Sequence, residues 1–209
     1  MTEPAPNDER QPTLRDRQRV AIRAELRRAA YRLFTDRGFD AVSVDDITEA
    51  AGMSRRTFFR HVTSKEDLLL GPVRHGGAAI ARLLEEQPSK VRPDRALMDA
   101  IVARASAFED DESTDWRAAL LSAPDLLDKV TMISAADRAH IVKLTAARMR
   151  TDPEVDARPG LLVQLAFAAG DYGFQQWIRQ ADAGVKPLRV WVEESLQAIL
   201  HRRWSDSVP

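Results

Sequence analysis

Apolar side chains recur every three to four residues along most of the chain, which is the spacing of one face of an α-helix. A clear example runs from Leu14 to Arg37, and Gly38 directly after it is a common helix terminator. No segment shows the alternation of apolar and polar residues that marks a half-buried β-strand, and the sequence contains no internal repeat. The pattern therefore predicts an all-α fold of about nine helices.

Residues 43–65 predict two short helices joined by a tight turn, a helix-turn-helix. Ser43 is a favourable N-cap for the first helix, and Gly52 can adopt the positive φ that ends it. Ser54 caps the second helix, in which Phe58 faces inward. The side chains left to face outward or to flank this helix are Arg55, Arg56, Thr57, Phe59, Arg60 and His61. Such a face fits a DNA groove.

A fourth helix is predicted to begin at Lys65, after Ser64 as its cap, and to meet Gly71-Pro72 within two turns. Because proline lacks the backbone N–H and disfavours helix in the residue before it, we expect a kink or a restart there. Further helices are expected over residues 95–108, 116–121, 124–150, 155 or 159 to 183, and 187–204, with the acidic run 109–112 as a solvated linker. The predicted parts are a disordered tail (1–12), a helix-turn-helix domain (13–66) and a larger helical body (67–205).

Charge is distributed unevenly along the chain. The net charge is -1, yet residues 10–65 contain thirteen Lys and Arg against seven Asp and Glu. A basic segment attracts phosphate, so the asymmetry predicts a DNA-binding head on a body with another task. The alternative is that the arginines only mark helix faces that are exposed to solvent.

Several classes of site are excluded or not expected. The chain has no cysteine, which rules out disulfides and thiolate ligands, and its four histidines (61, 75, 140 and 201) form no pair at metal-binding helical spacing. We find no catalytic triad, glycine-rich phosphate loop or metal-ligand cluster, and therefore expect neither an enzyme nor a cofactor. No apolar run approaches the roughly 20 residues of a membrane span, and the first twelve residues lack a secretory signal. We expect a cytoplasmic, nucleoid-associated protein without a membrane partner.

Residues 17–70 resemble the DNA-binding domain of the tetracycline-repressor (TetR) family of bacterial transcription regulators. The matching marks are Ala29-Ala30-Tyr31-Arg32-Leu33-Phe34, Gly38-Phe39, Ser43-Val44, Ile47, Ala50-Ala51-Gly52, Ser54, Thr57-Phe58-Phe59-Arg60-His61 and Ser64-Lys65-Glu66-Asp67-Leu68. More loosely, Ala123-Pro124 and Trp177 resemble the mycofactocin-regulator type of C-terminal domain. The resemblance implies a homodimer whose heads enter successive major grooves of a near-palindromic operator. It also implies a ligand in the body that changes the head separation, usually to relieve repression.

Roles for the head residues follow from their chemistry. Arg55 and Arg56 are the candidates for reading guanine edges, although either could instead contact phosphate or solvent. The hydroxyls of Ser43, Ser54 and Thr57 and the Lys65 ammonium suit phosphate oxygens. His61 could donate to phosphate or cap the end of its helix. One departure is Phe59, where the family usually has tyrosine, so this residue offers an apolar contact without a hydroxyl.

The helix containing residues 161–178 is apolar on nearly all sides, so it must be buried on more than one side. One side carries small residues that allow close helix approach, and we expect this helix and the last one to form a four-helix dimer interface with a second copy. The alternative is ordinary packing within one subunit. The expected interface residues are Leu162, Ala166, Ala169, Gly170, Gly173, Trp177, Val192, Ser195, Leu196 and Ile199.

Two charged residues, Arg104 and Asp171, lie within apolar stripes, which is costly unless they are paired. They either pair with each other or with local backbone, or they line a pocket for a small molecule with polar or anionic groups. The candidate pocket residues are Arg104, Phe108, Met132, Met149, Phe167, Asp171 and Phe174. The leading hypothesis is therefore a ligand-responsive repressor. The alternative is an architectural DNA-binding protein on the same fold without an inducer, which would occupy many sites instead of a few operators.

Overall fold

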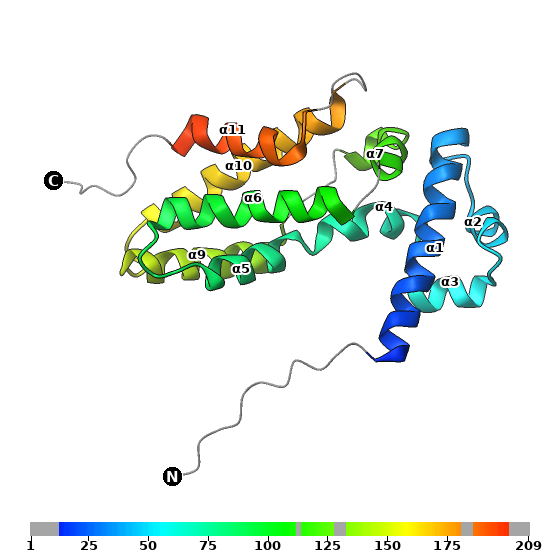
Figure 1. The fold of residues 1–209 in the computed structure, drawn as a ribbon, viewed down its shortest axis with the longest axis horizontal. Coiled ribbons are helices and arrows are strands. Elements are labelled where there is room, and N and C mark those ends of the chain that lie inside the picture. Colours follow the sequence, from blue (N-terminus) through cyan, green and yellow to red (C-terminus); the bar gives the residue numbers. More distant parts are fainter. Residues whose placement is uncertain (1–12, 112–113, 128–132, 181–185, 201–209) are drawn as a thin grey trace, which may run out of the picture.

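The computed structural model of the chain describes residues 13–111, 114–127, 133–180 and 186–200 (Figure 1). All regular secondary structure in these ranges is helical, which confirms the predicted all-α class. The helices are α1 (Leu14–Arg37), α2 (Val44–Ala50), α3 (Arg55–His61), α4 (Lys65–Arg74), α5 (Gly76–Glu86), α6 (Pro93–Asp111), α7 (Thr114–Leu121), α8 (Pro124–Leu127), α9 (Ala135–Met149), α10 (Arg158–Arg179) and α11 (Leu188–Leu200). None of them is both long enough and apolar enough to cross a membrane.

A head of three helices, α1 to α3, lies at one end of the molecule (Figure 1). Its local signals act as predicted: the Ser43 and Ser54 side chains accept hydrogen bonds from backbone N–H groups in the first turns of α2 and α3. Gly52 has a φ of 62°, in the left-handed region that glycine adopts without a Cβ clash. Phe34 of α1 and Phe58 of α3 are fully buried between the helices. The predicted helix-turn-helix is therefore present.

The fourth helix does not break where the proline pair predicts. Pro72 lies inside α4, and the chain turns instead at His75, directly before α5. Proline deprives the Leu68 carbonyl of its usual helical donor, but the Tyr31 hydroxyl of α1 donates to this oxygen over 3.1 Å. A side chain from the head thus satisfies the carbonyl, and α4 continues past the proline.

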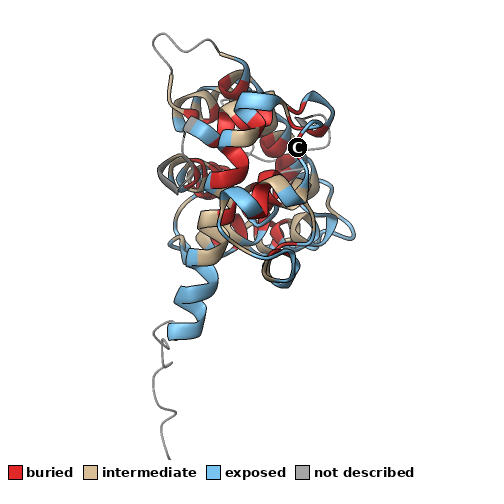
Figure 2. Ribbon diagram, turned by 90° about the vertical axis from the view of Figure 1, so that its right-hand side faces the viewer, coloured by how far each residue is buried: buried red, intermediate tan, exposed pale blue. Residues whose placement is uncertain are grey.

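The body is a layered arrangement of α5, α6, α9, α10 and α11, with its buried residues between the layers (Figures 1 and 2). The helices α10 and α11 pack most extensively. At Gly173 the two backbones meet so closely that a Cβ would lie 2.8 Å from the Trp191 carbonyl oxygen. Glycine is needed there because no other residue leaves this space.

Several expected boundaries in the body require correction. The acidic run is helical up to Asp111 instead of being a linker, and the Glu109 carboxylate accepts a hydrogen bond from the Leu188 N–H at the start of α11. The helix expected over 124–150 is divided into α8 and α9, with Ser134 as the N-cap of α9. The penultimate helix ends at Arg179, before the expected residue 183. The tail 1–12 and the expected end of the last helix at residue 204 lie outside the described residues.

Candidate DNA-binding surface and effector region

The outer face of α3 carries the side chains that the sequence predicts. Arg55, Arg56, Phe59 and Arg60 are exposed, Thr57 and His61 are half-buried, and Phe58 anchors the helix in the core. Phe59 is 52% exposed and offers an apolar surface beside the arginines. This face therefore presents arginines around an apolar ring, a combination suited to a DNA major groove.

The two candidate base-reading arginines differ in their surroundings. Arg55 Nη1 donates to both carboxylate oxygens of Asp45 on α2, at 2.9 and 2.8 Å, and its guanidinium lies 5.8 Å from the centre of the Phe59 ring. Arg56 is also exposed, one residue further along the helix. Arg55 is thus held against α2, whereas Arg56 in the same first turn of α3 is exposed.

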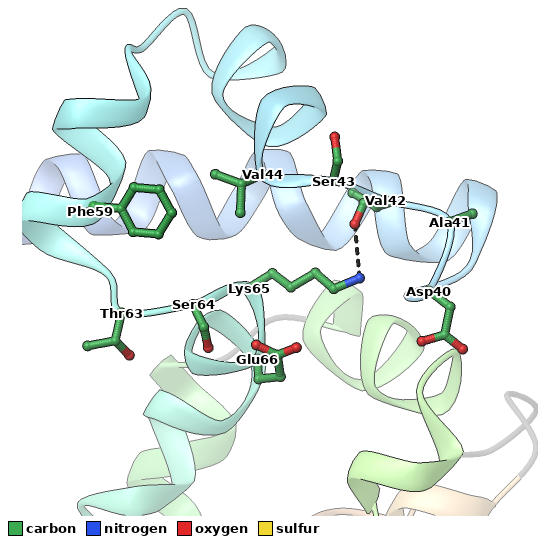
Figure 3. A pocket seen from close by; sticks show the side chains of 10 residues that line it. All are labelled: Asp40, Ala41, Val42, Ser43, Val44, Phe59, Thr63, Ser64, Lys65 and Glu66. Atoms are coloured by element: carbon green, nitrogen blue, oxygen red, sulfur yellow. Dashed lines mark hydrogen bonds between the residues drawn. The ribbon is translucent and has the colours of Figure 1, made fainter.

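Lys65 is tied to the protein itself. Its ammonium nitrogen donates to the Phe39 carbonyl (2.8 Å) and the Val42 carbonyl (3.0 Å), and it lies 4.2 Å from the centre of the Phe39 ring. Figure 3 shows the side chain extending beneath the loop that leads into α2. Lysine has three donors, so one N–H remains for a phosphate. The main role of Lys65 in this conformation is nevertheless to fix the loop between α1 and α2, which the sequence did not reveal.

An open hollow of about 450 Å³ lies between the starts of α2 and α4 and the end of α3 (Figure 3). Its lining includes the hydroxyls of Ser43, Thr63 and Ser64, together with two carboxylates, Asp40 and Glu66. The hydroxyls suit a phosphate oxygen, whereas the two negative charges oppose a free anion. The chemistry of the hollow therefore does not indicate a separate anion site.

His61 ends α3 within a cluster of positive charge. The Arg60 Nε donates to His61 Nε2 over 3.3 Å. Burial lowers the pKa of the His61 imidazole, and the charges of Arg60, Arg19 and Arg23 lower it further. The Nε2 atom of His61 thus accepts from Arg60, and its contact with phosphate stays a prediction. Arg19 and Arg23 of α1 lie close enough to act on this ring, and sequence reasoning did not single them out.

Helix α4 joins the head to the body through its carbonyl groups. The Leu68 oxygen accepts from Tyr31 of the head, as described above. One residue later, the Leu69 oxygen accepts from Trp116 Nε1 of α7 over 2.8 Å, and the Pro72 oxygen accepts from Arg104 Nη2 of α6 over 3.1 Å. Side chains from three other helices therefore hold the same two turns of α4. A displacement of α6 or α7 has a direct route to α4 and the head.

The structure separates the predicted pocket residues into two groups. Phe108 and Phe174 are buried in a cluster of aromatic rings with Trp116 and Trp177, whose ring centres lie 5.0 to 6.4 Å apart. The Arg104 guanidinium lies 5.2 Å from the centre of the Phe108 ring. Trp116 was missed by sequence reasoning, and Trp177 was assigned to the dimer interface although it is buried in this cluster.

The second group lies around Arg138 on α9. The Arg138 guanidinium is 5.4 Å from the centre of the Phe167 ring. Burial raises the pKa of the Asp171 carboxyl, and the charge of Arg138 partly offsets this effect. The charged neighbour of Asp171 is thus Arg138, while Arg104 bonds to the backbone of α4. Met149 is half-buried on α9, and Met132 lies outside the described residues.

The small-residue strip on α10 faces the interior of the same subunit, which corrects most of the expected dimer interface. Gly173 packs against the backbone of α11, and Gly170 lies near Ile101 of α6. Also buried within the subunit are Leu162, Ala166, Ala169, Trp177, Val192 and Leu196. Ser195 is half-buried and donates to the Trp191 carbonyl, whereas Ile199 is exposed. The packing within one subunit, the alternative interpretation, accounts for the strip.

A different face of α10 is open to solvent. Leu161 is 51% exposed and Tyr172 is 57% exposed, with Leu165 half-buried and Ala168 exposed between them. These four residues recur at three- or four-residue spacing, so they form one stripe along the helix. Because α10 is apolar on nearly all sides, periodicity alone could not show which stripe α11 covers.

Residues 26–71 match the family model described as bacterial regulatory proteins, tetR family. The chain is 30% identical to the HTH-type transcriptional regulator TcmR of Streptomyces glaucescens over 203 residues, 93% of this chain and 90% of that relative. MftR of Mycobacterium tuberculosis, named as a regulator of mycofactocin biosynthesis, is 29% identical over 72% of this chain and 76% of its own. A similar fold occurs in NalD, the secondary repressor of the MexAB-OprM multidrug efflux pump in Pseudomonas aeruginosa, with a TM-score of 0.54, 19% identity, and coverage of 86% of this chain and 95% of that chain.

Proposed function

The chain belongs to the tetR family of bacterial regulatory proteins, and we propose that this DNA-binding regulator is a homodimeric repressor released from a near-palindromic operator by a small molecule. The observation that carries the proposal is the outer face of α3, where exposed arginines surround the exposed ring of Phe59 on a helix anchored by Phe58. A regulator of this kind acts on DNA in the bacterial cytoplasm.

Recognition of the DNA base sequence is assigned to the first turn of α3. Arg56 is exposed and projects from the helix start, where a guanidinium can bind the O6 and N7 atoms of guanine. Arg55 can also contact a base if its hydrogen bonds to Asp45 break when DNA binds. Phe59 supplies an apolar contact for a thymine methyl or a sugar. Phosphate contacts are assigned to Ser43, Ser54, Thr57, Arg60, His61 and the remaining N–H of Lys65.

Dimerisation is assigned to the exposed stripe of α10, namely Leu161, Leu165, Ala168 and Tyr172, together with the exposed Ile199 of α11. Two large apolar side chains more than half exposed on one helix favour a covering partner. A second copy of the chain is the natural partner, because a twofold dimer brings the same stripe to itself and presents two heads to one operator.

The effector site is assigned to the aromatic cluster of Phe108, Trp116, Phe174 and Trp177, beside Arg104. Among the described residues, the buried Trp177 Nε1 has no hydrogen-bond partner, so a ligand acceptor there would satisfy it. Trp116 and Arg104 both donate to α4 carbonyls. A flat ligand that inserted among these rings would shift both donors, which supports coupling to the head through α4.

Selection from a pool of random DNA duplexes tests the DNA-binding assignment. We expect the wild-type protein to enrich one near-palindromic motif, and Arg56→Ala to lose enrichment at one base pair of each half-site. Arg82→Ala, an exposed residue of α5 in the body, serves as the control and should enrich the wild-type motif. Enrichment of no motif by the wild-type protein would support the architectural alternative and contradict the operator-specific repressor.

A further inference from the structure

Helix α1 begins about two turns before Ile22, its first residue that packs against the core of the head. The first buried residue of α1 is Leu26, whereas residues 14–21 are all exposed, including Leu14 (79%) and Val20 (66%). In Figure 2 this part is the exposed helix that projects from the molecule. Its helical state is fixed at the start, because Thr13 and Asp16 form a capping box. A helical extension that packs against no other helix gains little stability from folding alone. Contact with a partner would stabilise it.

The extension carries arginines along one face. Arg15, Arg19 and Arg23 are spaced four residues apart, so their side chains line up with a rise of about 6 Å between neighbours. Like charges at this spacing repel and destabilise an isolated helix. Nearby acids compensate only in part: Asp16 is bound to Thr13 in the capping box, and Asp67 lies 3.8 Å from Arg23. A row of positive charges with this spacing favours the binding of a polyanion.

This arginine face continues the basic end of the recognition helix. The charges of Arg19 and Arg23 reach His61, the last residue of α3, and Arg60 bonds to the same imidazole. Figure 1 shows the start of α1 extending past α3 at the lower edge of the head. A DNA duplex bound against α3 would therefore pass close to the extension.

We propose that residues 14–25 of α1 are a second DNA-contacting element, an arm in which Arg15 and Arg19, with Arg23, bind backbone phosphates flanking the base pairs read by α3. Guanidinium groups bind phosphate oxygens strongly and without regard to base sequence. The arm precedes residues 26–71, which match the family model, so it adds a contact to the matched head. The proposal rests on the DNA-binding function proposed above and extends its footprint outward.

The salt dependence of binding measures these contacts. Each phosphate neutralised on duplex DNA contributes about 0.9 to the slope of log affinity against log salt. A dimer has two arms, so Arg15→Ala/Arg19→Ala removes up to about four contacts and should lower the magnitude of the slope by roughly 2 to 4. At about 0.15 M salt we expect a loss of affinity of roughly 10- to 100-fold.

Two lengths of one selected operator locate the contact. One duplex ends at the outer edges of the two half-sites, and the other carries additional flanking base pairs. The wild-type protein should bind the longer duplex more tightly, whatever the flanking sequence, whereas Arg15→Ala/Arg19→Ala, which keeps only Arg23 of the row, should lose most of this preference. Arg15→Lys/Arg19→Lys keeps the charge and should retain most of the slope. Circular dichroism and thermal unfolding establish that each variant is folded.

Arg82→Ala/Lys143→Ala is the matched control, because it removes two exposed positive charges from α5 and α9 of the body. It should leave the slope and the preference for the longer duplex unchanged. An unaltered salt slope for folded Arg15→Ala/Arg19→Ala would contradict the proposed DNA contact of residues 14–25. Equal binding of both duplexes by the wild-type protein would contradict it as well. Failure of the wild-type protein to bind any selected duplex would instead refute the proposed function, so the two failures are distinct.

Discussion

Arg55 and Arg56 are neighbours on α3, but among the described residues only Arg55 forms an ion pair with a carboxylate, that of Asp45 on α2. A guanidinium that must break an ion pair before it contacts a base contributes less net free energy to DNA binding than one that forms no ion pair with α2. The difference assigns the larger share of base reading to Arg56. It is a distinction that the sequence alone could not make.

We therefore predict that Arg56→Ala weakens operator binding by about 1 to 3 kcal/mol, and that the loss is confined to operators with the preferred base at one position of each half-site. Arg55→Ala should cost less. Titrations with the selected operator and with single-base variants measure both effects. A larger loss for Arg55→Ala, or an equal loss on all operator variants for Arg56→Ala, would reverse the assignment.

The sequence predicted the local structural signals of the head correctly, because caps and turn glycines act locally: Ser43 and Ser54 are N-caps and Gly52 has a positive φ. It did not predict the partners of long side chains, which depend on the tertiary fold. Lys65 bonds to carbonyls 23 and 26 residues away in sequence, and Arg104 bonds to one 32 residues away. The effector residues remain predictions for the same reason.

At the scale of helices, the proline in α4 shows how a tertiary contact changes a local rule. Pro72 leaves the Leu68 carbonyl without a helical donor, and the Tyr31 hydroxyl supplies one. The helix thereby continues to His75. Sequence reasoning had the correct local chemistry but could not identify a donor on another helix.

A double-mutant cycle tests this explanation. Tyr31→Phe should lower the free energy of unfolding by about 1 to 2 kcal/mol, because it leaves a buried carbonyl without its donor. Pro72→Ala restores a backbone N–H at that position, so Tyr31→Phe should cost less in this background. Urea unfolding of the four proteins gives the coupling. Strictly additive effects would show that Tyr31 acts on stability independently of the proline.

The close contact of α10 and α11 gives a second prediction at this scale. Gly173→Ala places a Cβ within 2.8 Å of the Trp191 carbonyl oxygen and 2.9 Å of the Val192 Cα. Since backbone atoms cannot move aside cheaply, we expect a loss of about 1 to 3 kcal/mol in the free energy of unfolding. Gly160→Ala, on the same helix, meets no atom within 4 Å and should be neutral or slightly stabilising. Equal stabilities of the two variants would contradict the assigned packing.

For the whole molecule, the exposed stripe of α10 is the surface that we assign to the second copy. Leu161→Glu/Tyr172→Glu places like charges opposite each other across a twofold axis, and both positions are more than half exposed, so the subunit should still fold. We predict monomers by light scattering and a loss of operator affinity of at least about 100-fold, because two half-sites are no longer bound together. Dimers of this variant would move the interface to another surface.

The central claim is that two α3 helices of a dimer read one operator, and hydroxyl-radical footprinting on the selected operator tests it most directly. The account predicts two protected regions related by a twofold axis, on one face of the duplex, with their centres about 34 to 36 Å apart or a multiple of that spacing. Arg56→Ala should need a higher protein concentration for protection, and both regions should still appear together. A single protected region without symmetry, or protection spread evenly along the duplex, would contradict the account.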